Sequence, residues 1–128
     1  MEKKPMFFLC AICKNLAGMI YYSGVNMVCC GQDMDELEVN TADASPEKHV
    51  PVAVLAGEKV SVKVGSVPHP MTAEHLIDWV FLHTENGGQR KALKAGDQPE
   101  AEFCLVNDKP VAVYAFCNLD GLWMSPVN

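Results

Sequence analysis

The sequence predicts an all-β protein in which a small metal-binding module precedes an antiparallel β-sandwich. Three observations carry this prediction. From Val50 onward, short runs of strand-forming residues alternate with turn residues. Four of the six cysteines lie within the first thirty residues, at spacings that suit a metal site. The sequence has no convincing amphipathic helix pattern and no internal repeat.

Length and composition limit the classes of protein that remain. A chain of 128 residues accommodates one ordinary domain, or a compact domain of about 90 residues with a very small module. A hydrophobic content of 49% with 20% charged residues is typical of globular proteins and excludes disorder of the whole chain. The formal net charge of -6 argues against broad binding to nucleic acid or to an anionic membrane surface.

The apolar runs of the sequence are short. The longest, residues 6–13 and 50–57, are far below the roughly 20 residues of a membrane-spanning helix. Two lysines precede the first run, as in a signal peptide, but Lys14 ends it early and no small-x-small cleavage site follows. We therefore expect a cytoplasmic protein without a membrane span.

The first predicted element is a metal module over residues 1–37. It contains Cys10-Ala-Ile-Cys13 and the adjacent pair Cys29-Cys30. Two residues between the first cysteines let the chain turn so that both sulfurs face one ion. Adjacent residues on an extended strand point to opposite faces, so the second pair requires a kink, which Gly31 favours. The spacing predicts a strained tetrahedral site of four thiolates.

The apolar content of residues 1–37 is too low for folding without a metal. This favours a metal site over the two alternatives, a redox dithiol or buried unligated cysteines. Soft thiolates select iron or zinc, and the spacing does not separate these metals.

Residues 38–46 are acidic and rich in small residues, and we interpret them as a linker. The sandwich is predicted for residues 47–128, where turn residues such as Asn86-Gly87-Gly88 separate the strand signals. An α+β alternative with a helix over 71–79 competes with this prediction. Cys104, on an alternating strand, is expected to be buried. The predicted strands are 50–55, 59–64, 76–83, 89–93, 101–106 and 111–116.

Three of the four histidines lie where the backbone is restricted. Prolines on both sides of His69 fix its loop, as a ligand position requires. A single loop histidine is usually solvated, but His49, His69 and His75 in the loops of one sandwich are harder to dismiss. With Cys117 on a late strand, they indicate a site for iron, copper or zinc. His83, in the middle of a predicted strand, is assigned a structural role.

Together these motifs resemble desulfoferrodoxin, the two-iron superoxide reductase family of anaerobes and microaerophiles. The resemblance runs from Phe8 to Trp123 and implies a desulforedoxin-like, rubredoxin-like module followed by an immunoglobulin-like sandwich with a mononuclear non-haem iron. The segments that carry it are 10–13, 29–31, 47–51, 65–71, 74–75, 101–104 and 117–123.

The resemblance also implies the ligands of two iron sites. His49, His69 and His75 would be equatorial ligands of the second iron, and Cys117 its axial thiolate. The family has a fourth equatorial histidine where this chain has Asp120. A carboxylate oxygen and the nearer ring nitrogen of histidine are both two bonds from Cβ, so we favour ligation by Asp120 over an open, water-filled position. The first iron would be held as Fe(Cys)4 by Cys10, Cys13, Cys29 and Cys30.

The activity that the resemblance implies is the reduction of superoxide to hydrogen peroxide. Zinc offers no redox step, so iron is implied at the second site. Lys48 would attract the anion and order a proton-donating water, and Glu47 resembles the carboxylate that caps the ferric state. The Cys117 thiolate would push electron density toward the substrate.

The resemblance further implies a rubredoxin or similar electron donor and a homodimer. The Fe(Cys)4 site, with no open position, would carry electrons or stiffen its module. A second hypothesis is a non-enzymatic electron carrier or redox sensor, in which Asp120 marks decay of the catalytic centre. Metal analysis and the reaction of the reduced protein with superoxide discriminate between the two.

Overall fold

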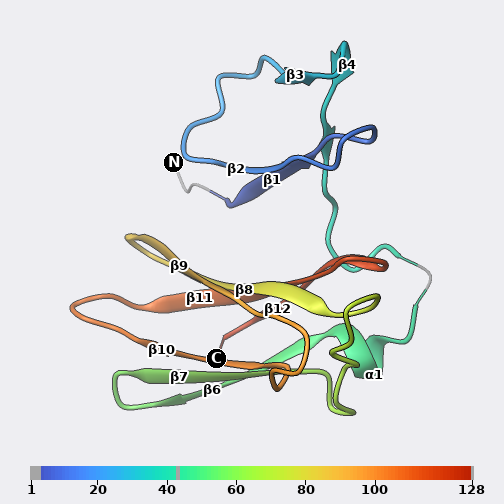
Figure 1. Ribbon diagram of the computed structural model, residues 1–128. Helices are drawn as coiled ribbons and strands as arrows, with labels where there is room; N and C mark the ends of the chain where they lie inside the picture. Colours follow the sequence, from blue (N-terminus) through green and yellow to red (C-terminus); the bar gives the residue numbers. More distant parts are fainter. Residues whose placement is uncertain (1–3, 43, 128) are drawn as a thin grey trace. The chain divides into compact units, whose positions relative to one another are not determined.

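The computed structural model describes residues 4–42 and 44–127 and divides into two compact units, Met1–Glu38 and Val39–Asn128. Within the described residues, the regular structure is β except for one short helix, α1 (Pro46–His49) (Figure 1). This confirms the predicted all-β class. The alternative helix over 71–79 is wrong, because a turn and the start of a strand occupy those residues.

The first unit is a small antiparallel assembly. A three-stranded sheet has the order β2-β1-β5, and β3 pairs with β4 as a separate hairpin. Phe8, Cys10 and Met34 form its buried core, with partly buried side chains packed around them. So small a core leaves the unit dependent on further cross-links. Its strands are β1 (Met6–Leu9), β2 (Leu16–Met19), β3 (Val28–Cys29), β4 (Gln32–Asp33) and β5 (Asp35–Glu36).

The second unit is a sandwich of two antiparallel sheets (Figure 1). One sheet has the order β10-β7-β6, and the other has the order β12-β11-β8-β9. The strands are β6 (Pro51–Ala56), β7 (Lys59–Val64), β8 (Ile77–Thr84), β9 (Gly87–Ala92), β10 (Glu100–Cys104), β11 (Pro110–Cys117) and β12 (Gly121–Pro126).

Alternating burial along the strands builds the sandwich core. On β7, Val60, Val62 and Val64 are buried, in one cluster with side chains of β8, β10 and β11. The same alternation on β10 buries Phe103 and turns Cys104 outward, so the expectation that Cys104 is buried is wrong. The core therefore fixes which strand ends and loops meet at each end of the sandwich.

The six strands predicted for the sandwich are present, with ends shifted by at most two residues, and β12 is an additional strand of the sandwich. Its sequence, Gly-Leu-Trp-Met-Ser-Pro, contains no β-branched residue, so its intrinsic strand signal is weak. Pairing with β11 from Ala112↔Pro126 to Cys117↔Gly121 stabilises it. Tertiary pairing, rather than local propensity, creates this strand.

Part of the segment interpreted as a linker is attached to the sandwich. Val39 forms an isolated bridge with Leu122, and the Asn40 N–H donates to the Leu122 carbonyl oxygen at 2.9 Å. The Asn40 side chain also accepts the Met124 N–H at 2.9 Å. These contacts lie within the second unit.

No membrane-spanning helix is found among the residues that the structure describes, because none of their helices has the length and apolar character that a span requires.

Candidate metal centres

The four cysteines of the first unit converge. The sulfurs of Cys10, Cys13, Cys29 and Cys30 all lie within 4.8 Å of one another. The Cys13 and Cys29 sulfurs are 3.6 Å apart. Cys10 is buried, whereas Cys13 and Cys30 are exposed. The structure brings together all four residues that the spacing predicts as ligands.

The turn after β1 positions the first pair of cysteines. The Lys14 N–H donates to the Cys10 carbonyl oxygen at 3.0 Å, and Lys14 adopts a positive φ of 67° that reverses the chain. The Cys13 N–H donates to the Cys10 sulfur at 3.4 Å. Because this bond favours the thiolate, it lowers the pKa of Cys10 to about 6.

The β3–β4 hairpin positions the second pair. Cys30 and Gly31 are its two central residues, with φ angles of 53° and 77°. Positive φ at both positions is the signature of a type I′ turn. The turn takes Cys30 out of the strand alternation, so the sulfurs of two adjacent residues reach one point. The predicted kink is confirmed, and it includes Cys30 as well as Gly31.

The electrostatics of this cluster suit a cation. Interaction with the Cys13 thiol is the largest cause that raises the pKa of Cys29, and together with Cys10 and burial it raises the pKa of Cys30 to about 12. Thiols this close oppose each other's ionisation unless a positive charge compensates. Four soft sulfur donors at this spacing fit a closed tetrahedral site for iron or zinc.

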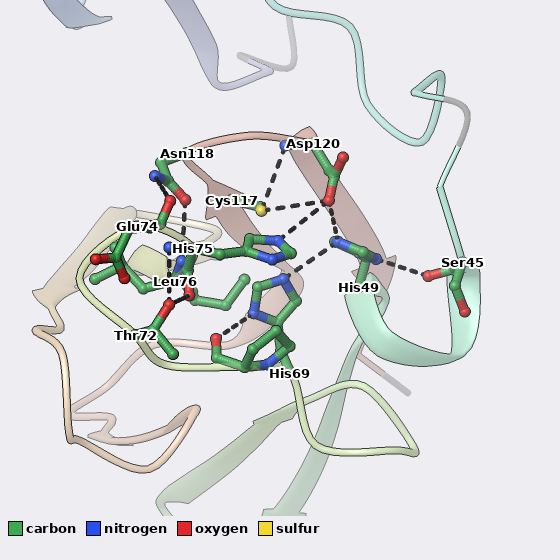
Figure 2. A network of polar contacts seen from close by, with 12 residues as sticks. Ser45, His49, His69, Thr72, Glu74, His75, Leu76, Cys117, Asn118 and Asp120 are labelled. Carbon is green, nitrogen blue, oxygen red and sulfur yellow. Dashed lines mark hydrogen bonds and ion pairs between the residues drawn. The ribbon is translucent and has the colours of Figure 1, made fainter.

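A second cluster lies in the second unit (Figure 2). His49 ends α1, His69 and His75 lie in the loop between β7 and β8, and Cys117 ends β11, with Asp120 in the turn that follows. One donor atom from each of the five lies within 4.8 Å of all the others. Because β8 and β11 are antiparallel, the start of one and the end of the other meet at the same end of the sandwich.

Backbone carbonyls orient two of the imidazoles. Nδ1 of His49 lies 2.7 Å from the Ser45 carbonyl oxygen, and Nδ1 of His69 lies 2.7 Å from the Pro70 carbonyl oxygen. A carbonyl only accepts, so each Nδ1 carries the proton and each Nε2 presents its lone pair to the cluster. Burial lowers the pKa of His69, which favours its neutral form.

Asp120 occupies a corner of the histidine arrangement. Its Oδ2 lies 2.9 Å from Nε2 of His49 and 3.3 Å from Nε2 of His75. The Nε2 atoms of His49 and His69 are 3.2 Å apart. Two donors at a right angle, each about 2.1 Å from a metal, lie about 3.0 Å apart. The donors of His69, His49, Asp120 and His75 thus follow one another at the spacing of corners around one ion.

The remaining donors also fit a metal. Nε2 of His75 is buried, and within residues 4–42 and 44–127 it makes no hydrogen bond beyond its 3.3 Å ion-pair contact with Asp120 Oδ2. A buried ring nitrogen without a good hydrogen bond is costly unless it binds something. The buried Cys117 sulfur accepts the Asp120 N–H at 3.4 Å and lies 3.8 Å from Asp120 Oδ2. Burial raises the pKa of Cys117, because a buried thiolate is costly unless a cation compensates its charge.

Glu47 and Lys48 precede His49 on α1, and both are exposed. The Glu47 carbonyl oxygen accepts the Val67 N–H at 3.0 Å, which fastens α1 to the loop after β7. Gly65 permits this approach, because a Cβ there would lie 2.8 Å from the Glu47 carbonyl oxygen. His83 lies on β8 opposite Ala112 and belongs to neither cluster.

Sequence reasoning missed the groups that support these ligands. Trp123 stacks on His49 with ring centroids 5.1 Å apart, and its Nε1–H donates to the Asp120 carbonyl oxygen at 3.0 Å. The carbonyls of Ser45 and Pro70 are backbone atoms, which every residue carries, so no residue type signals their role. Only the Trp123 ring, three residues from Asp120, could have been suspected.

Comparisons with known proteins agree with this architecture. The family model described as Desulfoferrodoxin matches residues 41–126. A desulfoferrodoxin homolog of Archaeoglobus fulgidus is 45% identical and covers 98% of this chain and 99% of its own length. The desulfoferrodoxin of Nitratidesulfovibrio vulgaris is 42% identical, covering 96% of this chain and 97% of its own length. The crystal structure of the superoxide reductase from Treponema pallidum superposes with a TM-score of 0.81 at 40% identity, covering 96% and 99% of the two chains. The chain therefore belongs to the desulfoferrodoxin family.

Proposed function

We propose that this protein is a superoxide reductase, which reduces superoxide by one electron to hydrogen peroxide at the cluster in the second unit. The observation that carries the proposal is the convergence of three imidazoles, one thiolate and one carboxylate within 4.8 Å. The relative from Treponema pallidum, which matches nearly the whole chain, bears the name superoxide reductase.

Iron is the metal that we propose for this cluster. His49, His69, His75, Cys117 and Asp120 would hold it. When bound, iron supplies a coordination position for the substrate and the one-electron redox step, the second of which zinc cannot supply. The mixed imidazole, thiolate and carboxylate donors are compatible with this choice.

The residues around the cluster have separate tasks in this proposal. Lys48 provides a cation in a chain with a formal net charge of -6, so it attracts an anionic substrate and orders a proton-donating water. Glu47, beside it, provides a carboxylate that caps the site between turnovers. Cys117 contributes an electron-rich sulfur, and the N–H of Asp120 moderates its charge.

Asp120 makes this site different from that of a four-histidine protein. It contributes a negative charge where an imidazole would be neutral, which favours the ferric over the ferrous state. The same charge opposes the approach of an anion, so the contribution of Lys48 increases. We therefore propose a slower but measurable reaction.

We also propose that the cysteine cluster holds a second iron as Fe(Cys)4. A closed set of four thiolates leaves no position for a substrate, so this site would carry electrons or stiffen its unit. A rubredoxin or similar protein would supply electrons, and the chain would act as a homodimer, as the family resemblance implies.

The test combines metal analysis with stopped-flow mixing. Protein produced with ample iron should contain two irons per chain, and the reduced form should consume superoxide and release an equal amount of hydrogen peroxide. A second site that is filled with zinc under these conditions, or ferrous protein that does not react, would contradict the proposal.

The alternative is an electron carrier or redox sensor. The presence of Asp120 where the family has a histidine favours this alternative. Such a protein would bind both irons and cycle between redox states without reacting with superoxide. The peroxide yield in the stopped-flow experiment separates the two functions.

A further inference from the structure

Asn118 connects the end of β11 to both neighbours of His75 (Figure 2). Its Oδ1 accepts the Leu76 N–H at 3.0 Å, and its Nδ2 donates to the Glu74 carbonyl oxygen at 2.9 Å. Its backbone N–H donates to the Leu76 carbonyl oxygen at 3.2 Å. One exposed residue thus makes three hydrogen bonds to the segment that carries His75.

These bonds begin where regular strand pairing ends. Phe116 of β11 lies opposite Trp79 of β8, but Cys117 lies opposite Ile77, so the register shifts between them. Such a shift interrupts the ladder of backbone hydrogen bonds. Beyond it, the Asn118 amide supplies a donor and an acceptor as a paired strand would, and it joins residues 74–76 to the Cys117 turn.

His75 needs such support more than the other histidines. The rings of His49 and His69 are fixed by carbonyl oxygens 2.7 Å from Nδ1. The described residues offer His75 no equivalent ring bond, and 30% of its side chain is exposed, against 4% for His49. The position of its imidazole therefore depends on its backbone.

Thr72 holds the same backbone from the other side. Its Oγ1 accepts the His75 N–H at 3.1 Å, and its N–H donates to the His75 carbonyl oxygen at 2.9 Å. These bonds close the turn over residues 72–75 upon itself. They do not relate it to β11, so beyond the pairing of Ile77 with Cys117 the side-chain connection to the end of β11 is made by the Asn118 amide.

We propose that Asn118 is a positioning residue that holds the His75 imidazole at its place beside Cys117 and Asp120. The inference rests on the proposed iron site and adds a residue to it that touches neither metal nor substrate. Loss of the amide would leave the 72–75 turn intact but held to the end of β11 only through the Asn118 backbone N–H and the pairing of Cys117 with Ile77, so His75 would be less well fixed and a weaker donor.

The experiment measures ferrous iron affinity of the full-length protein by anaerobic competition with a chelator. Changing an outer-shell partner of a metal ligand typically lowers affinity about 10- to 100-fold, and we expect Asn118→Ala to fall in this range at the second site. The ferric thiolate band of that site should shift, while the spectrum of the cysteine site in the same molecule should not. Asn86→Ala is the matched control, because Asn86 Nδ2 also binds a backbone carbonyl, that of Asn107 at 3.4 Å, in a loop at the other end of β11.

A double-mutant cycle separates positioning from general stabilisation. If Asn118 acts through His75, the variant with both His75→Ala and Asn118→Ala should bind iron no more weakly than His75→Ala alone. Additive losses, or unchanged iron affinity in Asn118→Ala, would overturn the inference. Wild-type protein that binds no iron at the second site would refute the proposed site itself, and the inference with it.

Discussion

The two candidate metal centres are assembled in opposite ways. The cysteine cluster takes its donors from two turns of a small unit, with Cys10 and Cys29 only 19 residues apart, and two of its four cysteines are exposed. The second cluster joins His49 to Asp120 across 71 residues, and most of its members are buried. The geometry of the cysteine cluster is set by local turns, whereas the geometry of the second cluster is set by the tertiary structure of the sandwich.

This difference determines what each site needs in order to exist. The first unit has a small core, in which one cluster holds three buried side chains, so we expect its fold to depend on a bound metal. The sandwich has a continuous apolar core of its own, so its fold should precede metal binding. A metal at the cysteine cluster would be needed for folding, whereas a metal at the second cluster would bind to a unit that has already folded.

The largest expected effect comes from replacing one cysteine of the first unit, because the fold of this unit is expected to depend on its metal. In Cys13→Ser, we expect loss of the first iron, of the visible absorption of the oxidised thiolate site, and of resistance of residues 1–38 to protease. Iron content, absorption spectra and limited proteolysis check this. Unchanged iron content and spectrum would show that Cys13 is not a ligand.

The matching change at the second site should leave the fold intact. Cys117→Ser should remove the sulfur-to-iron charge-transfer band, and the superoxide rate should fall by more than the roughly 10- to 100-fold typical of outer-shell changes. The far-UV circular dichroism and the spectrum of the cysteine site should stay unchanged. Unfolding of the sandwich in this variant would contradict the view that its fold precedes metal binding.

Asp120 allows a finer test. Because a carboxylate ligand favours ferric iron, the reduction potential should be lower in the wild type than in Asp120→His, by a shift that redox titration can measure. Asp120→Ala, which removes the donor, should lower the metal content as well. Equal potentials in all three proteins would show that Asp120 is not a ligand.

The smallest expected effect concerns the approach of substrate. Lys48→Ala should lower the second-order rate with superoxide by about 10-fold, with a weaker dependence on ionic strength, because a steering charge has been removed. Lys109→Ala makes the same change of charge at the opposite end of β11 and should leave the rate almost unchanged. Equal rates for both variants would remove Lys48 from the mechanism.

The contrast between the sites also explains what the sequence could predict. The cysteine cluster follows from spacing, because its geometry is local, and even the kink at Cys30-Gly31 could be expected. The positions of His49, His69 and Cys117 in one cluster depend on how distant loops meet, so the residue types and loop positions only suggested a shared metal site, and the family resemblance supplied the ligand roles. Asn118 gave no signal, because asparagine after a strand is an ordinary turn residue.

The strands divide in the same way. Clear alternation predicted Lys59–Val64 at its observed bounds, whereas β12 depends on pairing with β11 and was missed. Cys104 was predicted on the buried face of its strand, which is wrong. Alternation shows that successive residues face opposite sides, but it does not show which side is buried when both neighbours are apolar or small. The short strands of the first unit have too few residues for any period to show.

The contact between His49 and Asp120 has a further consequence for how the protein comes apart. Bringing together residues 71 positions apart costs conformational entropy in a free chain, and an ion held by both would act as a cross-link that the unfolded state lacks. Unfolding of the sandwich would then have to break this link early, so the loaded protein should unfold more slowly than the metal-free protein. Iron in the second site would be retained by a kinetic barrier as well as by its affinity.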